Sequence, residues 1–302
     1  MPQIYTVEKD YHNTRFDRWF KSKIINLPQS LVEKIIRLNK VKINKKKIKS
    51  SYRVQAGDTV DVYDISKFKI SERSKIIKYK PSRKEVNIYD DYIIENNENF
   101  VVINKPAGIA VQSGTNSFRN IVDILKETKY FEHYKPFIVH RLDKETSGIL
   151  IIAKTREYAQ LFTSLFRIRK IHKTYVALTY GKILKSAITL KDDLVIFENK
   201  KRIVQKAVSH LKVIKTTPDF SYVELNPITG RKHQLRKQLY NIGSPIIGDD
   251  KYFINRRANK IKLRNKSLML HAYKIKFMIN NIQYNFKAKY NNLFEDFLKK
   301  NI

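Results

Sequence analysis

The spacing of apolar residues changes near residue 87, and this change limits the possible folds more than any other feature of the chain. Beyond Asn87, short apolar and β-branched runs alternate with segments of helical periodicity. Such runs predict strands, and their mixture with short helices predicts an α+β domain dominated by a sheet. The expected strands are 100–103, 148–153, 175–179, 204–213, 222–225 and 268–277, and the expected helices are 120–127, 156–166 and 231–242.

Residues 14–64 have a different pattern, in which two short amphipathic helices precede alternating strands. Each helix would begin at a capping box, a spacing in which side chains satisfy the first amides of a helix. The two capping boxes are Thr14 with Asp17 and Ser30 with Glu33. Alternation predicts strands at 41–44 and 59–63. We therefore expect a small unit of helices and strands ahead of the larger domain.

The chain is strongly basic, because 61 Lys and Arg residues stand against 28 Asp and Glu and give a formal net charge of +33. Nucleic acid is the simplest partner for such an excess. A codon bias toward Lys would add bases, but it would not explain the scarcity of acids. On the small unit, a solvated charged face is nearly as compatible with the pattern as an RNA-binding face. The candidate RNA contacts there are Arg15, Arg18, Arg37, Lys40 and Lys42.

The two patterns meet at a basic segment. Residues 67–85 hold eight Lys or Arg against Glu72 and Glu85, contain Pro81 and show no regular periodicity. We interpret the segment as a linker that orders on RNA. The expected organisation is a small domain at 1–66, a linker at 67–86 and a larger domain at 87–302.

Missing residue types and motifs exclude several kinds of protein. The chain has no cysteine, which rules out disulfides, thiolate metal sites and cysteine nucleophiles. Its seven His lack ligand spacing, and no glycine-rich nucleotide-binding sequence occurs, so we expect neither metal nor cofactor. Residues 1–10 do not resemble a secretory signal, and the longest apolar run, 148–153, is too short to span a bilayer. We expect a cytoplasmic protein with no membrane partner.

A polar sequence at 140–148, His-Arg-Leu-Asp-Lys-Glu-Thr-Ser-Gly, leads directly into the apolar run 149–152. A short loop anchored by a buried strand is a suitable place for a catalytic carboxylate, which here would be Asp143. Alternatively, Asp143 caps a turn and Arg141 pairs with Glu145. The pattern alone leaves both interpretations open.

Two other segments carry candidate polar residues. Thr229 can cap a following helix, in which Leu235 and Leu239 place Arg236 beside an apolar face. A partly buried Arg needs a carboxylate partner, for which Asp143 is a candidate.

In the third segment, Lys173 and Tyr175 would share one face of a strand. Tyr175 is then either a core residue with its hydroxyl at the rim or part of a site.

Together these segments resemble a known family. Residues 140–148 match the H-R-L-D-x-x-T-S-G signature of RluA-type pseudouridine synthases. Further motifs recur in the order and approximate spacing of that family. They are the Lys-Pro-Ala-Gly loop at 105–108, the Lys-Thr-Tyr strand at 173–175, and the segments 230–236, 248–252 and 270–272.

The small unit resembles the alpha-L RNA-binding domain first seen in a small-subunit ribosomal protein, through residues 15–17, 37–44 and 56–60. That family often has Gly where this chain has Asn39, and Asn tolerates a positive φ well, so the turn is expected to persist. With this domain in front, the chain is similar to the RluC type, which acts on large-subunit ribosomal RNA.

The resemblance implies a fold and an activity. The fold would be α+β, with a mainly antiparallel, mixed-sheet catalytic domain behind a small α/β alpha-L domain. The activity would be cofactor-free conversion of a flipped uridine to pseudouridine, with Asp143 as the nucleophile. Tyr175 would pack against the base and assist removal of the C5 proton. Arg236 would form an ion pair with Asp143 and lower its pKa against the effect of burial.

The resemblance also implies RNA contacts. Arg141 would enter the RNA stack where the uridine leaves it, and Lys105 and Arg231 lie in motifs expected to contact RNA. The expected partner is large-subunit ribosomal RNA, and the protein is expected to be a monomer without an obligate protein partner. Gln238 and Phe253 depart from the family pattern, but neither is among the residues assigned to chemistry.

Three other functions fit part of the pattern. The chain could be a non-catalytic ribosome-assembly factor on the same fold, or a general nucleic-acid binder. The presence of Asp143, Tyr175 and Arg236 favours an enzyme over both. A glycoside hydrolase fits least well, because no second carboxylate is evidently paired with Asp143.

Overall fold

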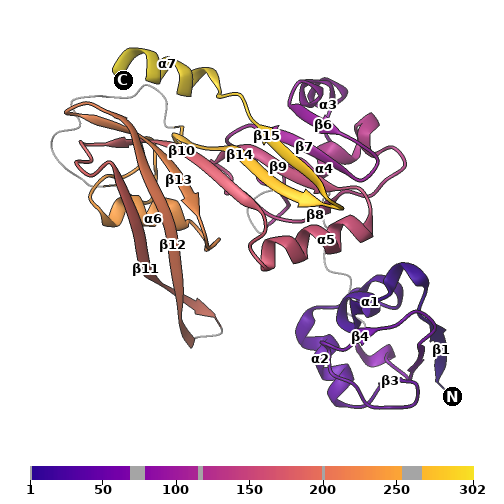
Figure 1. Cartoon of the computed structure of the whole chain (residues 1–302). Coiled ribbons are helices and arrows are strands. Elements are labelled where there is room, and N and C mark those ends of the chain that lie inside the picture. Colours follow the sequence, from indigo (N-terminus) through magenta and orange to yellow (C-terminus); the bar gives the residue numbers. More distant parts are fainter. Residues whose placement is uncertain (1, 69–78, 115–117, 199–200, 254–266) are drawn as a thin grey trace. The chain divides into compact units, whose positions relative to one another are not determined.

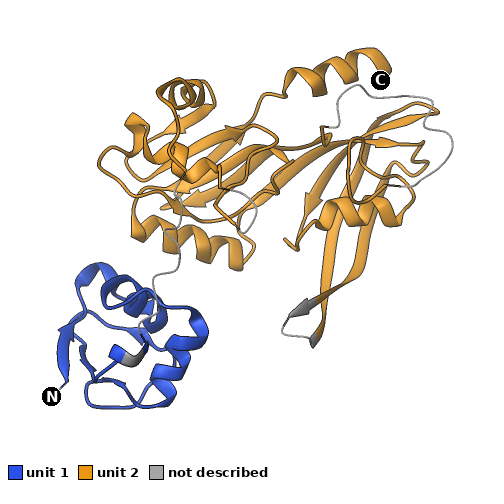
Figure 2. Ribbon diagram, turned by 180° about the vertical axis from the view of Figure 1, so that it is seen from behind, with its two compact units in different colours: residues 1–77 blue, residues 78–302 orange. Residues whose placement is uncertain are grey.

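The computed structural model describes residues 2–68, 79–114, 118–198, 201–253 and 267–302 (Figure 1). The chain forms two compact units, residues 1–77 and 78–302 (Figure 2). Half of the predicted linker, at 69–78, lies outside the described residues. Its last residues are helical, however, because Ser82 caps helix α3 (Arg83–Asp90) by accepting from the amide of Glu85. The prediction that the linker extends to residue 86 is therefore wrong.

The first unit is a small α/β domain, as expected. Its elements are β1 (Gln3–Thr6), β2 (Thr14–Arg15), α1 (Phe16–Lys23), α2 (Gln29–Arg37), β3 (Val41–Ile43), β4 (Arg53–Val54), β5 (Thr59–Val62) and two 3-10 turns, η1 (Lys9–Tyr11) and η2 (Ser66–Phe68). β5 lies between β1 and β3 in an antiparallel sheet, and β2 pairs with β4. The helices bury Phe16, Trp19 and Ile35 in one core. Asn39 has φ of 53°, which confirms the predicted turn.

Neither predicted capping box forms. α1 and α2 begin without a side-chain cap, at the N-cap positions Arg15 and Pro28. Asp17 instead accepts two hydrogen bonds from the Arg15 guanidinium, at 3.2 and 2.8 Å. A cation two residues away offers this carboxylate a charge-assisted bond, which is stronger than a bond to an amide.

The second unit is built around a ten-stranded sheet. Its strands are β6 (Ile93–Asn96), β7 (Phe100–Lys105), β8 (Phe137–Ile138), β9 (Ser147–Ala153), β10 (His172–Tyr180), β11 (Ala187–Glu198), β12 (Lys201–Thr216), β13 (Phe220–Pro227), β14 (Leu270–Ile279) and β15 (Ile282–Lys287). The order is β11-β12-β13-β10-β14-β9-β7-β6, with β15 beside β14 and β8 beside β9. The β14–β9 pair is parallel, and the other neighbouring strands in this order pair antiparallel. This agrees with the expected mainly antiparallel, mixed sheet.

Helices complete the second unit: α3, α4 (Ile121–Lys126), η3 (Lys129–Phe131), α5 (Arg156–Arg167), α6 (Gln234–Asn241) and α7 (Asn292–Asn301). Each predicted strand and helix has a counterpart. The elements that were not predicted are β6, β8, β11, β15, α3, η3 and α7. α6 begins three residues later than expected, after His233, so Thr229 does not cap it. Thr229 instead donates to the side chain of Gln234 at 2.7 Å. None of the helices in the described segments is long and apolar enough to cross a membrane.

Strand β9 is buried along its whole length, between β14 on one side and β7 on the other. Gly148 has φ of 106°, and a Cβ built on it would lie 2.3 Å from the carbonyl oxygen of Ala272 in β14. Only glycine can occupy this position without strain, because it has no Cβ and tolerates a positive φ. Gly148 therefore permits the close approach of two strands just after the predicted catalytic loop.

We predict that Gly148→Ala lowers the free energy of unfolding by at least about 3 kcal/mol, from the clash and the positive φ together. Gly181 is the matched control, since its φ is 80° but a Cβ there would meet nothing within 4 Å. Gly181→Ala should lose only about 1–2 kcal/mol. Urea denaturation of both variants would measure the difference, and equal losses would contradict the steric account.

Candidate active site

The loop between β8 and β9 holds Asp143 and is tied down at both sides. The amide of Thr146 donates to the carbonyl of Asp143 at 3.1 Å, which closes a turn before β9. The carbonyl of Lys144 accepts from the amide of Gly108 at 2.9 Å and from the Nζ of Lys105 at 3.1 Å. The Asp143 side chain is 27% exposed, so its carboxylate remains accessible from outside.

Lys105 supports this loop from the interior. Its side chain is fully buried, and its Nζ also donates to the carbonyls of Pro106 at 2.8 Å and Ile109 at 3.0 Å. Three carbonyl acceptors match the three protons of an ammonium group. Burial lowers the pKa of Lys105 to about 7, against the opposing charges of Glu145 and Asp143. The prediction that Lys105 contacts RNA is therefore wrong, because its amine faces the protein.

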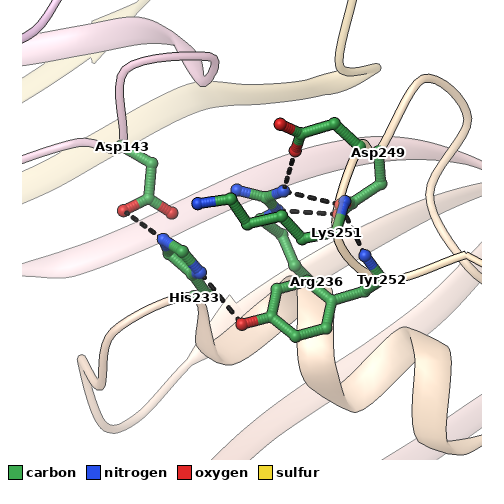
Figure 3. Close-up of polar contacts among 7 residues, drawn as sticks. Asp143, His233, Arg236, Asp249, Lys251 and Tyr252 are labelled. Atoms are coloured by element: carbon green, nitrogen blue, oxygen red, sulfur yellow. Dashed lines mark hydrogen bonds and ion pairs between the residues drawn. The ribbon is translucent and has the colours of Figure 1, made fainter.

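His233 contacts Asp143 from the other side of the site (Figure 3). Its Nε2 lies 3.8 Å from Oδ1 of Asp143, and its Nδ1 lies 3.0 Å from the hydroxyl of Tyr252. Burial lowers the pKa of His233 despite the nearby Asp143, so the neutral ring is favoured. A negative carboxylate favours the tautomer that presents an N–H, and this tautomer leaves Nδ1 free to accept from Tyr252. His233 thus directs Nε2–H toward Asp143.

Arg236 does not form the predicted ion pair with Asp143. Its Nε and Nη2 donate to the two oxygens of Asp249 at 2.7 and 2.6 Å, and Nη2 also donates to Asp250 at 2.9 Å (Figure 3). Burial alone would lower the pKa of Arg236, but the bonds and charge of Asp249 outweigh it, and Asp143 raises the pKa a little further. Arg236 therefore remains within electrostatic range of Asp143.

The chain reversal at 248–252 explains why Arg236 pairs with Asp249 and not with Asp143. Gly248 has φ of 77°, and a Cβ on it would lie 2.0 Å from the carbonyl oxygen of Ser267. One oxygen of Asp249 also accepts from the amides of Lys251 and Tyr252, at 2.9 Å each. These two amides hold the carboxylate in place, and the bidentate guanidinium of Arg236 completes its bonds.

Tyr175 lies on β10 and lines a small recess together with Lys173. This agrees with the predicted shared face of the two residues. Burial, and to a lesser degree the charge of Asp143, raises the pKa of the Tyr175 phenol. Tyr175 is therefore a neutral side chain beside the carboxylate.

The predicted RNA-binding residues differ in their exposure to solvent and in the contacts that they make within the protein. Arg141 and Arg231 are exposed, although Arg231 donates to the carbonyl of Lys206 at 3.3 Å. In the first unit, Arg15 is held by Asp17, while Arg18 and Arg37 are exposed. Lys40 and Lys42 are half-buried. The Nζ of Lys42 lies 5.5 Å from the centre of the Tyr63 ring.

Sequence reasoning identified the motifs that contain His233, Asp249 and Tyr252 but gave these residues no role. One signal was available: Asp249 and Asp250 directly follow Gly248, in a chain with 28 acids against 61 bases. Such acids are natural partners for a buried cation.

Comparison with known proteins agrees with this fold and site. A sequence model of the family described as RNA pseudouridylate synthase matches residues 99–241, and a model of the S4 domain matches residues 22–60. The chain is 34% identical over 281 residues to "Ribosomal large subunit pseudouridine synthase C" of Rickettsia conorii, covering 87% of this chain and 88% of that protein. It is 31% identical over 288 residues to the protein of the same description from Vibrio vulnificus, covering 91% and 88%.

A solved structure is also similar. "Human RNA Pseudouridylate Synthase Domain Containing 4" has a TM-score of 0.58 and 28% sequence identity, over 71% of this chain and 94% of that one. The fold and the site define an RNA-modifying isomerase. The chain belongs to the RNA pseudouridine synthase family, with an S4 domain before its catalytic domain.

We predict that Asp249→Asn lowers the free energy of unfolding at pH 7 by about 3–5 kcal/mol, because it leaves the Arg236 guanidinium buried without its carboxylate. Asp250→Asn is the matched control, since the Asp250 side chain is 63% exposed. It should lose about 1 kcal/mol or less. Urea denaturation would measure both, and equal effects would contradict the assignment of Asp249 as the main partner.

The same pair predicts a pH dependence. Burial would raise the pKa of Asp249, but the bonds from Arg236 and two amides outweigh it, so the folded pKa lies below the usual value of an Asp. The folded state then binds fewer protons than the unfolded state as the pH falls below this value. The stabilisation is complete above about pH 5 and is lost as the pH falls through the folded pKa. Asp249→Asn should therefore lose less stability than the wild type between pH 5 and pH 3.

Proposed function

We propose that this enzyme converts specific uridines of large-subunit ribosomal RNA to pseudouridine, with Asp143 as the nucleophile. The observation that carries the proposal is the accessible Asp143 carboxylate, held on an anchored loop among Tyr175, His233 and Arg236. The names of the relatives from Rickettsia conorii and Vibrio vulnificus supply the class of RNA.

The reaction rearranges a nucleotide without gain or loss of atoms. The N1–C1′ bond breaks, the base turns, and a C5–C1′ bond forms. A proton leaves C5, and N1 regains one. Because nothing is oxidised, reduced or transferred elsewhere, the proposed reaction uses no cofactor.

Within the site, Asp143 supplies the negative charge and its neighbours keep it in place. The Nε2 of His233 lies 3.8 Å from one carboxylate oxygen, which is within ion-pair range but longer than a hydrogen bond. Arg236 adds positive charge nearby without neutralising Asp143, because its own bonds are to Asp249. This arrangement leaves the carboxylate of Asp143 free to reach the flipped nucleotide.

Tyr175 is proposed to pack against the flipped base. A neutral phenol is a weak base. The raised pKa of Tyr175 also lowers the fraction of the side chain that is present as phenolate. These properties support a packing role more strongly than direct removal of the C5 proton.

Access to the base requires that the uridine leave the RNA stack, which costs a few kcal/mol. Arg141 is two residues from Asp143 and exposed, and its guanidinium can stack on the bases that remain. Phosphate contacts from the S4 domain would supply binding energy for this opening.

We predict that Asp143→Asn lowers the rate of pseudouridine formation by at least about a thousandfold, because Asn cannot act as a nucleophilic carboxylate. The affinity for RNA should stay within about threefold of the wild type, since the charged surfaces are unchanged. Tritium release from a large-subunit rRNA transcript labelled at uridine C5 would measure the rate. Asp219→Asn, at an exposed acid on the β12–β13 turn, should retain activity. Turnover by Asp143→Asn would remove Asp143 from its proposed role.

We also predict that the triple variant Arg18→Gln, Arg37→Gln, Lys40→Gln binds the transcript with a weaker dependence on salt. Each lost phosphate contact lowers the slope of log affinity against log salt by about 0.7–0.9, so a total of about 2–3 is expected. Arg15→Gln is the control, because Arg15 is occupied by Asp17 and should change stability more than the slope. An unchanged slope in the triple variant would show that these residues do not bind phosphate.

A further inference from the structure

Lys173 is a half-buried cation that makes no hydrogen bond, ion pair or ring contact within the part of the chain that the structure describes. It lies on β10, two residues before Tyr175, and lines the same recess. Its Nζ is 3.9 Å from the position of a Cβ built on Gly230, the residue that precedes Arg231. Its amine therefore lies between the Tyr175 strand and the segment that leads to His233.

Two titratable groups that line the recess with Lys173 are neutral. His140 lines the recess, and its Nε2 accepts from the amide of Ile151 at 2.9 Å. Burial, with a smaller effect from Lys173, lowers the pKa of His140 to about 3, so its ring is uncharged. Tyr175 is neutral as well. Burial lowers the pKa of Lys173, and no acid offsets this effect.

The neighbouring strands add further positive charge. Lys274 lines the recess and stands directly opposite Lys287 in the β14–β15 pair. Burial, and then the charges of Lys276 and Lys287, lowers the pKa of Lys274, while Glu224 acts in the opposite direction. Like charges opposite one another in a sheet are destabilising. Folding therefore gains nothing from this concentration of lysines.

Lys105 is a buried lysine whose hydrogen bonds stabilise the fold, and it differs from Lys173 in this respect. Its ammonium donates to three carbonyls, so each of its protons has an acceptor. Lys173 has none. A buried charge without a partner destabilises the folded protein. Features that destabilise the fold occur most often at functional sites.

We propose that Lys173, assisted by Lys274, binds a phosphate of the RNA strand beside the uridine that is modified. The inference rests on the proposed function, because it takes RNA as the source of the phosphate. Two residues along a strand span about 7 Å, which places the Lys173 backbone within reach of the nucleotide that packs on Tyr175. A phosphate would supply the missing acceptors and the missing negative charge together.

The proposal predicts opposite effects on stability and on binding. In full-length protein without RNA, Lys173→Met should raise the melting temperature, because it removes an uncompensated charge and keeps the apolar stem. Lys105→Met is the matched control, and it should lower the melting temperature, because three carbonyls lose their donor. A melting temperature of Lys173→Met below that of the wild type would overturn the proposal, since the amine would then be satisfied within the protein.

Binding to a large-subunit rRNA transcript, measured over a range of salt concentrations, provides the second readout. Lys173→Met should lower the slope of log affinity against log salt by about 1, the effect of one lost phosphate contact. Lys300→Met removes an equal charge from the exposed face of α7 and should leave the slope unchanged. An unchanged slope in Lys173→Met overturns the proposal.

The two proposals can fail separately. Pseudouridine formation by the wild type with an unchanged slope in Lys173→Met would leave the function standing and remove the phosphate site. A slope that depends on Lys173 in a wild type that forms no pseudouridine would leave the phosphate site standing and remove the function.

Discussion

The burial of strand β9 on both edges determines where the chemistry of this protein can take place. β9 can lie against β14 only because Gly148 has no side chain, and the loop that enters β9 carries Asp143. The buried ammonium of Lys105 holds that loop by donating a hydrogen bond to the carbonyl of Lys144. The carboxylate is therefore positioned by a strand that is buried along its whole length, while its side chain remains accessible. Preorganisation of this kind is what a reaction at a single carboxylate requires.

Charges inside the second unit fall into two groups. Arg236 with Asp249 and Lys105 with its carbonyls have complete sets of partners, and we assign them to holding the site together. Asp143 and Lys173 have incomplete sets, and both lie near Tyr175. A charged group with an incomplete set of partners does not stabilise the fold. Such groups are expected at sites where a ligand supplies the missing partners.

Much of the fold could be predicted from the sequence, because it is expressed in local patterns. The loop at 140–148 leads into a buried strand as the apolar run indicates, and α4 lies within the predicted helix at 120–127. β11 was missed because charges at 191–193 interrupt its apolar pattern. The partner of Arg236 was missed for another reason: Asp249 reaches it through a reversal at Gly248, and residue spacing carries no information about such a contact. Lys105 could not be placed either, since a lysine that binds carbonyls and one that binds phosphate look alike in sequence.

The most direct test of this account is a map of pseudouridines in large-subunit rRNA from cells that lack the gene. Carbodiimide treatment and primer extension would mark each modified position, before and after the gene is returned. The account predicts that specific stops disappear in the deletion, return with the wild-type gene, and do not return with a gene encoding Asp143→Asn. A map that is the same with and without the gene would contradict the assignment of large-subunit rRNA as the substrate.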